Sequence, residues 1–508
     1  MGEQTAHGSF SPRFFWLSSL LISLIGAVFQ LINLRPSLID LFAFRQTHTA
    51  IAIKEFMDGN WSLATPFTTL GPPWQMAYEF PLFQAVAAIV GNVFELDVDT
   101  TARMTGLGFF LISGLLLAIL IRRWFGTTAA LIALTLFQFM PFGIQWASSS
   151  LIEFTAVSCV LGAVLAIERN SRKFSWSMFS LATLLLSLAS AVKGTTTVAW
   201  ALVFLVAGSG LVWHKRLQLR AVLTALISTL LGLGFGLIWT AYADNTKMEN
   251  PVAKNLTSEQ LFQWTYGTLE QRLTFEQWDQ IFERLPSLGA SLWIFIVLLV
   301  IALWRLKLNA RLVALASVPF IGTLIFFNLY VVHSYYLSAI YPAYVAVVAI
   351  GVTALSRLIH HRQISLIVAS ALSALLVFLS WTSTEGRAIT ALIGVEGQFP
   401  EISRVIAEST PPDAGVIVVG CDWDPTPLYY ADRKGMTVPP WFDEKVPTAW
   451  VGNELNYLIF CGENYSVANG DPSTVLPTGS LYKVVSPGIY QVFGPDVVTR
   501  ILNWSVVP

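Results

Sequence analysis

The chain has 508 residues, of which 55% are hydrophobic and only 12% are charged, and its formal net charge is −1. A soluble domain carries about 25% charged residues, so this composition excludes an ordinary soluble protein and indicates a polytopic membrane protein. The sequence also has no basic run, which argues against a nucleic-acid partner.

Long apolar segments recur along most of the chain, and a length of ~20 apolar residues per span predicts about eleven membrane-spanning helices. The first of these segments is expected to be a retained helix, because Arg13 is the only early positive residue and no small-residue cleavage site follows it. The segments are Phe14–Leu34, Met104–Ile121, Phe125–Ala147, Leu151–Ile167, Phe174–Val192, Thr195–Trp213, Ala221–Tyr242, Pro286–Leu303, Leu312–Val332, Leu337–Leu355 and Ile364–Trp381.

Basic residues follow every even-numbered segment, and short cytoplasmic loops are where Lys and Arg accumulate. These residues are Arg122, Arg123, Arg169, Arg172, Lys173, Lys215, Arg216, Arg220, Arg305, Lys307, Arg311, Arg357 and Arg362. We therefore expect a cytoplasmic N-terminus. A long first loop at Arg35–Arg103 and the tail at Thr382–Pro508 are expected on the opposite side of the membrane.

The first outer loop and the tail have patterns of their own. In the loop, residues 47–57 mix apolar and polar positions as an interfacial helix does, and "EFPLFQAVAAIVGNVF" predicts a second, shorter helix. In the tail, "FPEISRVIAESTPPDAG" predicts a helix, and "AGVIVVGCD", "LNYLIFCG" and "LYKVV…GIYQVF" predict strands. We therefore expect a membrane domain at 1–381 and a small α/β domain outside the cytoplasm at 382–508. Cys421 and Cys461 either pair with each other or are two separate buried thiols.

Ionisable residues gather at the predicted outer ends of the helices, where charge is costly unless it is used. They are Asp40, Arg45, His48, Glu79, Glu153, Lys193 and His333, accompanied by Tyr335 and Tyr336. Most also have a structural explanation: Asp40 as a helix cap or a partner for Arg35, Arg45 as a headgroup anchor, Lys193 as a snorkelling side chain, His333 as a structural residue near a helix end and the tyrosines as an aromatic belt. Glu79 and Glu153 are harder to explain in this way, because acids gain little from a membrane boundary. Carboxylates can accept a hydroxyl proton or bind a divalent metal, and Lys, Arg and His can bind phosphate. As a set on one side of the membrane, they suggest transfer of a group from a lipid phosphate.

Four motifs then resemble the GT-C class of integral membrane glycosyltransferases, in particular the bacterial branch related to protein O-mannosyltransferases and the lipid A aminoarabinose transferase. They are Asp40 followed by "FRQTHTA", "YEFPLFQ", "AVKGTT" and "HSYYLSAIYP", in that order over about the first 355 residues. The sequence departs from the family where Leu41 follows Asp40 and where Phe80 replaces a proline. It also has no evident β-trefoil insert between Ala243 and Leu285.

The resemblance implies a GT-C-like bundle in a bacterial inner membrane that transfers a sugar, with inversion, from a polyprenyl-phosphate donor to a lipid, glycan or protein acceptor outside the cytoplasm. The implied roles are catalytic for Asp40, Glu79 and Glu153, and donor-phosphate binding for Lys193, His333 and Arg45. The substrate-lining residues would be His48, Tyr78, Tyr335 and Tyr336, and a divalent metal ion on Glu79 and His333 is a candidate cofactor.

Two other functions are compatible with a polytopic chain. A transporter or lipid flippase would have paired broken helices near the bilayer midplane, and the sequence shows few charges within its apolar segments. A non-catalytic assembly subunit would use its outer tail to bind a partner, and would tolerate loss of the loop acids.

Overall fold

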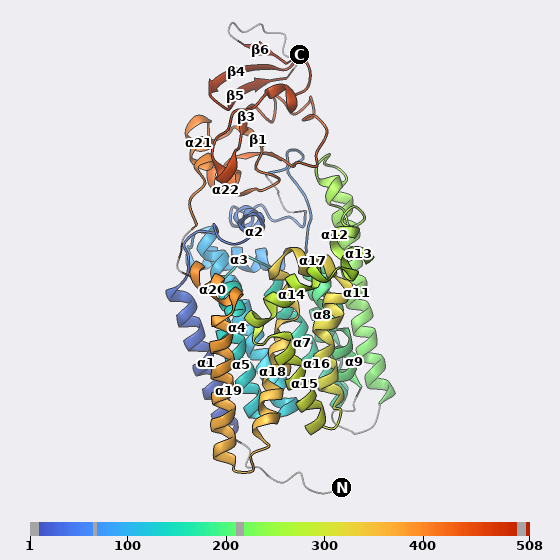
Figure 1. Cartoon of the computed structure of the whole chain (residues 1–508). Coiled ribbons are helices and arrows are strands. Elements are labelled where there is room, and N and C mark those ends of the chain that lie inside the picture. The colour runs from blue at the N-terminus through green and yellow to red at the C-terminus, as the bar shows by residue number, and fades with distance from the viewer. Residues whose placement is uncertain are drawn as a thin grey trace. The chain divides into compact units, whose positions relative to one another are not determined.

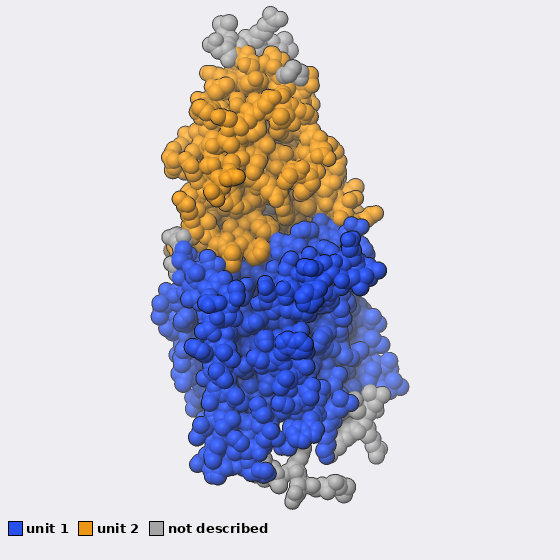
Figure 2. Space-filling model, in the orientation of Figure 1, with its two compact units in different colours: residues 1–35, 103–240, 261–395 blue, residues 36–102, 241–260, 396–508 orange. Residues whose placement is uncertain are grey.

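The computed structural model describes residues 10–64, 69–209, 218–393, 395, 397–494 and 504–507. Lys215 and Arg216, part of the predicted orientation pattern, lie outside these residues. The chain forms two compact units (Figure 2), one of residues 1–35, 103–240 and 261–395 and the other of residues 36–102, 241–260 and 396–508. The second unit thus combines the first outer loop and a short central segment with the tail. The predicted division at residue 381 groups the chain differently and stays a prediction.

The first unit is helical (Figure 1), and α4 and α11 each continue into the second unit. Its helices are α1 Pro12–Ile32, α4 Val98–Phe125, α5 Thr127–Phe139, α6 Pro141–Trp146, α7 Glu153–Arg172, α8 Trp176–Ala199, α9 Ala201–Gly208, α11 Leu219–Lys247, α12 Phe262–Tyr266, α13 Leu269–Leu273, α14 Phe275–Leu288, α15 Leu292–Arg305, α16 Ala310–Ile325, α17 Phe327–Val332, the 3₁₀-helix η2 Ser334–Ala339, α18 Tyr341–Ser356, α19 Arg362–Thr382 and α20 Thr384–Leu392.

Among the described residues, five helices are long and apolar enough to cross a membrane, namely α1, α4, α8, α11 and α19. A sixth span results if α14 and α15, which are bent by 64° at their junction, are counted together. The chain therefore has the character of a multi-pass membrane protein. The predicted count of about eleven is not confirmed, because several predicted segments are shorter apolar helices or are interrupted.

The interruptions occur at identifiable residues. The predicted segment 125–147 divides at Met140, whose extended backbone precedes Pro141, a residue that favours the first turn of a new helix. The predicted segment 312–332 divides at Phe326, between α16 and α17. The prediction missed these breaks because hydropathy reports apolarity and not the continuity of the helix.

Close helix packing in the first unit depends on small residues. Gly232 and Gly236 of α11 face Leu186 and Ser190 of α8, where an added Cβ would lie 2.5 Å and 2.8 Å from the neighbouring Cβ atoms. Spacing small residues four apart lets two membrane helices approach closely. These glycines therefore allow α8 and α11 to pack closely.

The second unit is built on a six-stranded sheet with the order β2-β1-β3-β5-β4-β6. The strands are β1 Gly415–Val419, β2 Lys434–Val438, β3 Tyr457–Phe460, β4 Leu481–Ser486, β5 Ile489–Phe493 and β6 Ser505–Val506. β2, β1 and β3 are parallel and the others antiparallel. The helix α21 Glu401–Ser409 and the predicted strands are confirmed, whereas α22 Thr426–Ala431 and β2 were not predicted.

The first outer loop is hydrogen-bonded to this sheet. Thr437 in β2 donates its amide to Thr69 at 3.0 Å, and the Gly71 amide donates to Gly435 at 2.9 Å. The loop also forms α2 Ala43–Met57 and α3 Leu82–Phe94. α2 packs against α3 and α22, and ten of its fifteen residues are buried. The structure therefore differs from the interfacial helix that the sequence predicts, because α2 is covered by protein on most sides.

Cys421 and Cys461 form a disulfide, which resolves the two alternatives left open by the sequence. The bond joins the ends of β1 and β3 and packs on the small hydrophobic core that Ile402, Val416 and Ile459 help to form. Disulfides persist in oxidising compartments, and the location of the tail outside the cytoplasm stays a prediction.

We predict that this disulfide stabilises the second unit. It closes a loop of 40 residues in sequence separation, and removing such a bond typically lowers the free energy of unfolding by about 2–5 kcal/mol. Cys421→Ser should therefore lower the melting temperature of the purified protein, and Cys159→Ala, at the buried free thiol, is the control. Maleimide labelling of unfolded, unreduced protein should mark one of the three cysteines. Labelling of all three without reductant would contradict the pairing.

Candidate active site

Lys193 and Glu153 form a buried ion pair in the first unit. Their Nζ and Oε1 atoms lie 3.2 Å apart, and the two side chains are only 8% and 3% exposed. Glu153 is the first residue of α7, where the helix dipole favours a negative charge. Lys193 has extended backbone angles inside α8, so the helix is interrupted where the lysine lies. Irregular backbone among membrane helices is tolerated where it is buried in protein or lines a cavity.

A group of rings adjoins this ion pair. The Lys193 ammonium lies 4.6 Å from the centre of the Tyr336 ring, an attractive cation–π arrangement. Tyr336 packs against Tyr335 with ring centres 4.6 Å apart, and His333 stacks on Tyr335 at 5.2 Å. η2 and the turn before it hold these rings and contact α7. The structure thus brings together Glu153, Lys193, His333, Tyr335 and Tyr336, as the sequence predicts that they share one face.

A second cluster lies in the second unit, on the first turns of α2. Arg45 pairs with Glu79, and its guanidinium lies 3.1 Å from Nδ1 of His48. Arg45 and His48 are three residues apart and therefore share one face of the helix. The ring of His48 meets the ring of Tyr78 edge-on at 4.2 Å. The four predicted residues Arg45, His48, Tyr78 and Glu79 therefore form one connected group.

Burial keeps His48 uncharged. Removal from solvent, with a smaller contribution from the charge of Arg45, lowers the pKa of His48 well below its ordinary value of 6.5. Burial also raises the pKa of Tyr78 well above 10. At neutral pH the Arg45–Glu79 ion pair therefore lies beside a neutral imidazole and a neutral phenol, which can hydrogen-bond a polar ligand.

Asp40 precedes α2 in the chain and contacts Gln46 of that helix. Its carboxylate accepts a hydrogen bond from the side-chain amide of Gln46, which is fully buried and also donates to the Leu41 carbonyl at 3.1 Å. Gln46 is adjacent to Arg45, and neighbouring positions on a helix do not face each other. A side chain of α2 thus holds Asp40 in place.

Three residues of this region were not predicted. Lys247 lies at the end of α11, 5.3 Å from the Tyr78 ring, and pairs with Asp244 at 3.4 Å. Trp423 follows the disulfide cysteine Cys421 and reaches His48, with ring centres 6.3 Å apart. In the sequence, the only feature that marks Gln46 is an amide side chain among charged neighbours. No local pattern marks Lys247 or Trp423, because each reaches the cluster through long-range packing.

The predicted metal site has little support in the geometry. Among the residues that the structure describes, no group of three or more His, Cys, Asp or Glu side chains could hold a metal ion. Glu79 instead faces the guanidinium of Arg45. Glu79 and His333 belong to different compact units, and their pairing around a metal stays a prediction.

Comparison of the sequence with known proteins finds no matching family model and no match among curated proteins. Comparison of the structure with solved structures does find matches. The aminoarabinose transferase ArnT of Cupriavidus metallidurans, bound to undecaprenyl phosphate, superposes with a TM-score of 0.54 at 14% identity, over 96% of this chain and 98% of that one. An oligosaccharyltransferase of Archaeoglobus fulgidus gives 0.60 at 12% identity, over 98% and 76%.

The chain has the GT-C fold. A further structure of the archaeal GT-C enzyme, in complex with an inhibitory peptide and a dolichol phosphate, superposes with a TM-score of 0.53 at 13% identity, over 97% of this chain and 76% of that one. At such low identities the likeness establishes the fold alone, and the roles of individual residues must be argued from this chain.

We predict that the stability of the folded protein depends on having both members of the Lys193–Glu153 pair or neither. Removing one member of a buried ion pair leaves an uncompensated charge and typically destabilises by about 3–5 kcal/mol. Glu153→Gln and Lys193→Met should each lower the melting temperature by several degrees in detergent. The double variant should recover part of the loss, whereas additive losses would show that the charges do not interact.

We predict a pH dependence from His48. In the unfolded chain the His48 imidazole binds a proton near pH 6.5, and in the folded chain it does so only at lower pH. The contribution of His48 to the free energy of unfolding is therefore fully present above about pH 6.5 and is lost as the pH falls below that value. His48→Gln should remove this contribution, which approaches about 1.4 kcal/mol per pH unit for one proton. Thermal melts of both proteins from pH 7.5 to 5 measure it, and parallel curves would contradict the assignment.

Proposed function

We propose that the protein is a glycosyltransferase that moves a sugar from a polyprenyl-phosphate-linked donor to an acceptor outside the cytoplasm, with inversion. The observation that carries the proposal is the buried Lys193–Glu153 pair at a helix interruption beside His333, Tyr335 and Tyr336. The fold adds support, because ArnT and the archaeal oligosaccharyltransferase are structures in which undecaprenyl phosphate and dolichol phosphate are bound.

The donor phosphate would bind Lys193. A phosphate is a doubly or singly charged acceptor of hydrogen bonds, and an ammonium in a dry site attracts it strongly. Glu153 keeps this ammonium in place when no donor is bound, so we assign it a positioning role as the counter-ion of Lys193. His333 would add a hydrogen bond to the phosphate, and Tyr335 and Tyr336 would line the site.

The bond changes follow from these roles. The acceptor oxygen attacks the anomeric carbon of the sugar from the face opposite the phosphate, the new glycosidic bond forms, and the bond between that carbon and the phosphate oxygen breaks. The polyprenyl phosphate leaves with the electron pair, stabilised by Lys193, and one displacement inverts the configuration. Asp40, oriented by Gln46, would accept the proton of the attacking hydroxyl.

The second cluster would bind the sugar or the acceptor. Glu79 and Arg45 can each hydrogen-bond sugar hydroxyls, and Arg45 can also contact the phosphate. His48 and Tyr78, both uncharged at neutral pH, would complete the lining. One structure of the archaeal enzyme contains zinc and sulfate, and a divalent metal near Glu79 remains a candidate in this chain. The steps above use only the chain's own residues.

A transporter is the second candidate, because the structure contains interrupted membrane helices. α8 is broken at Lys193, and α14 and α15 meet at 64°. Transport proteins use such breaks to bind substrates. The two functions differ in chemistry: a flippase would deliver the lipid-linked sugar intact across a vesicle membrane, and a transferase would cleave it.

We predict that purified protein in liposomes releases polyprenyl phosphate from a matched polyprenyl-phosphate-sugar, with extracted envelope material as the acceptor pool. A panel of labelled hexosyl and pentosyl donors covers the unknown sugar. Asp40→Asn should slow release about 10²–10⁴-fold, since it removes a general base, and Lys193→Met and Glu79→Gln should also slow it.

Matched controls are Asp279→Asn and Glu249→Gln at exposed positions and Lys254→Met at a half-buried position that pairs with Glu444, which should keep wild-type rates. Intact donor that changes leaflet without cleavage would support the transporter instead. Full activity of both Asp40→Asn and Glu79→Gln on the true donor would contradict the assigned chemistry.

A further inference from the structure

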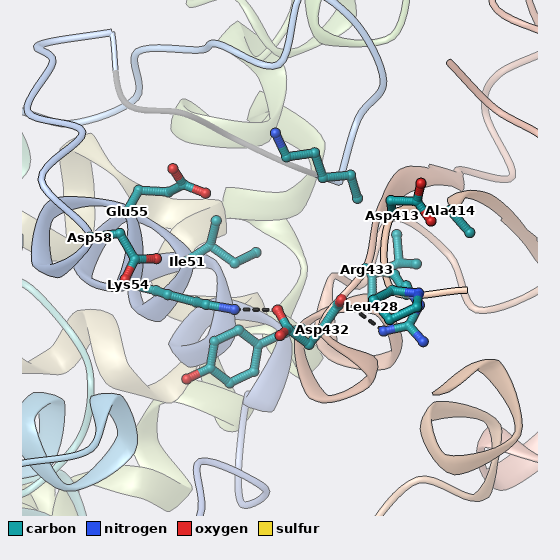
Figure 3. A pocket seen from close by; sticks show the side chains of 12 residues that line it. Ile51, Lys54, Glu55, Asp58, Asp413, Ala414, Leu428, Asp432 and Arg433 are labelled. Carbon is teal, nitrogen blue, oxygen red and sulfur yellow. Dashed lines mark hydrogen bonds and ion pairs between the residues drawn. The ribbon is translucent and has the colours of Figure 1, made fainter. Parts of the chain in front are cut away.

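A cavity of about 410 Å³ lies within the second unit, apart from the cluster around Arg45 (Figure 3). The last turns of α2 form one wall, with Lys54, Glu55 and Asp58. The segment before β1 and the region between α22 and β2 form the other, with Asp413 and Arg433. Figure 3 shows Glu55 and Asp58 on the opposite side of the cavity from Asp413. The volume is large enough for a small polar molecule or part of a larger one.

The lining is unusual in carrying both signs of charge at close quarters. Seven of its twelve residues carry charged side chains, four of them acids and three of them bases. Lys54 pairs with Asp432 across the cavity. The Arg433 guanidinium donates to the carbonyls of Thr410 at 2.8 Å, Ala431 at 3.0 Å and Ala407 at 3.1 Å. The hydrogen-bonding capacity of that arginine is therefore largely used by the protein itself.

This balance favours one class of ligand. A phosphate group would meet more carboxylates than cations. Two of the three cations, Lys54 and Arg433, are already bound to other groups of the protein. A lipid tail would meet a mostly ionisable wall and would lose the hydrophobic gain of burial. Sugar hydroxyls both donate and accept hydrogen bonds, so each can pair with a carboxylate or with an ammonium. Saccharides are thus the ligands whose chemistry matches both kinds of group.

An aromatic side chain adds a firm surface to the cavity. Tyr429 lines it, and the phenolic hydroxyl donates to Asp99 at 2.5 Å. Both residues belong to the second unit, and the neighbouring Tyr430 donates to the other oxygen of Asp99 at 2.8 Å. The Tyr429 side chain is therefore fixed before any ligand arrives, which lowers the entropy lost on binding.

The position of the cavity along α2 connects it with the cluster described above. His48 and Lys54 are six residues apart on the same helix, a rise of about 9 Å. One rigid helix therefore carries the Arg45–His48 group near one end and the cavity wall near the other. A ligand of a few sugar rings could occupy the cavity while its end group lies toward the cluster.

We propose that this cavity is a subsite for a saccharide part of the acceptor. This inference rests on the proposed function, because it takes the bound saccharide to be part of the acceptor. The acceptor would then be a glycan or a glycolipid with at least one sugar in the cavity. Glu55, Asp58, Asp413 and Lys434 hydrogen-bond its hydroxyls, and Tyr429 forms one side. Binding does not require the donor or the transfer step.

The test measures binding without catalysis. Full-length protein in nanodiscs, fluorescently labelled, is applied to an array of defined oligosaccharides, and dissociation constants are then determined for the sugars that bind. Asp58→Trp and Asp413→Trp fill the cavity from its two walls at exposed positions, where folding should tolerate them. Glu408→Trp, at an exposed position on α21 outside the cavity, is the matched control.

We expect wild type and Glu408→Trp to bind the same oligosaccharides, and each cavity variant to bind them at least tenfold more weakly. Because the binding assay contains no donor, a failed transfer assay would leave this result intact. Absence of any oligosaccharide binding, equal binding by the cavity variants, or displacement of the sugar by millimolar inorganic phosphate would overturn the proposal.

Discussion

The account depends on a lysine and a glutamate that are kept from water together. An isolated ammonium or carboxylate among apolar helices would be very costly, and mutual attraction at 3.2 Å offsets part of that cost. The arrangement in turn requires α7 to begin at Glu153 and α8 to be interrupted at Lys193. A chain that needed only stability would place apolar residues here, as replacement of buried ion pairs by well-packed apolar residues is often neutral or stabilising. We propose that the pair serves a ligand whose phosphate takes the place of the glutamate.

The second unit shows how distant segments of the chain become one functional body. α2 from the first outer loop packs against α22 from the tail, and the hydroxyl oxygens of Thr47 and Thr426 lie 3.1 Å apart. The disulfide at Cys421 anchors the turn that carries Trp423 to His48. Asp424 in the same turn accepts hydrogen bonds from the Thr426 amide at 2.8 Å and from Tyr465. The tail thus contributes to the surroundings of the loop residues and is more than an appended domain.

Much of this structure could be predicted from the sequence where the signal is local. Apolar length marks α1 and α19 to within a few residues, and β-branched runs mark β1 and β3. The grouping of Glu153, Lys193 and His333 on one face follows from charge at the ends of apolar segments. Long-range packing is invisible to such patterns, so α2 was expected at a membrane surface and is buried. For the same reason Lys247 and Trp423 were missed, whereas the gap between the predicted segments 174–192 and 195–213 did mark the break at Lys193.

The most direct measurement is a structure of the protein with undecaprenyl phosphate, determined in nanodiscs by electron microscopy. The account predicts the phosphate within salt-bridge reach of the Lys193 ammonium, with Glu153 drawn away from its place beside it and the His333 ring turned toward the phosphate. A phosphate bound elsewhere, with the pair between Lys193 and Glu153 still closed, would contradict the central claim.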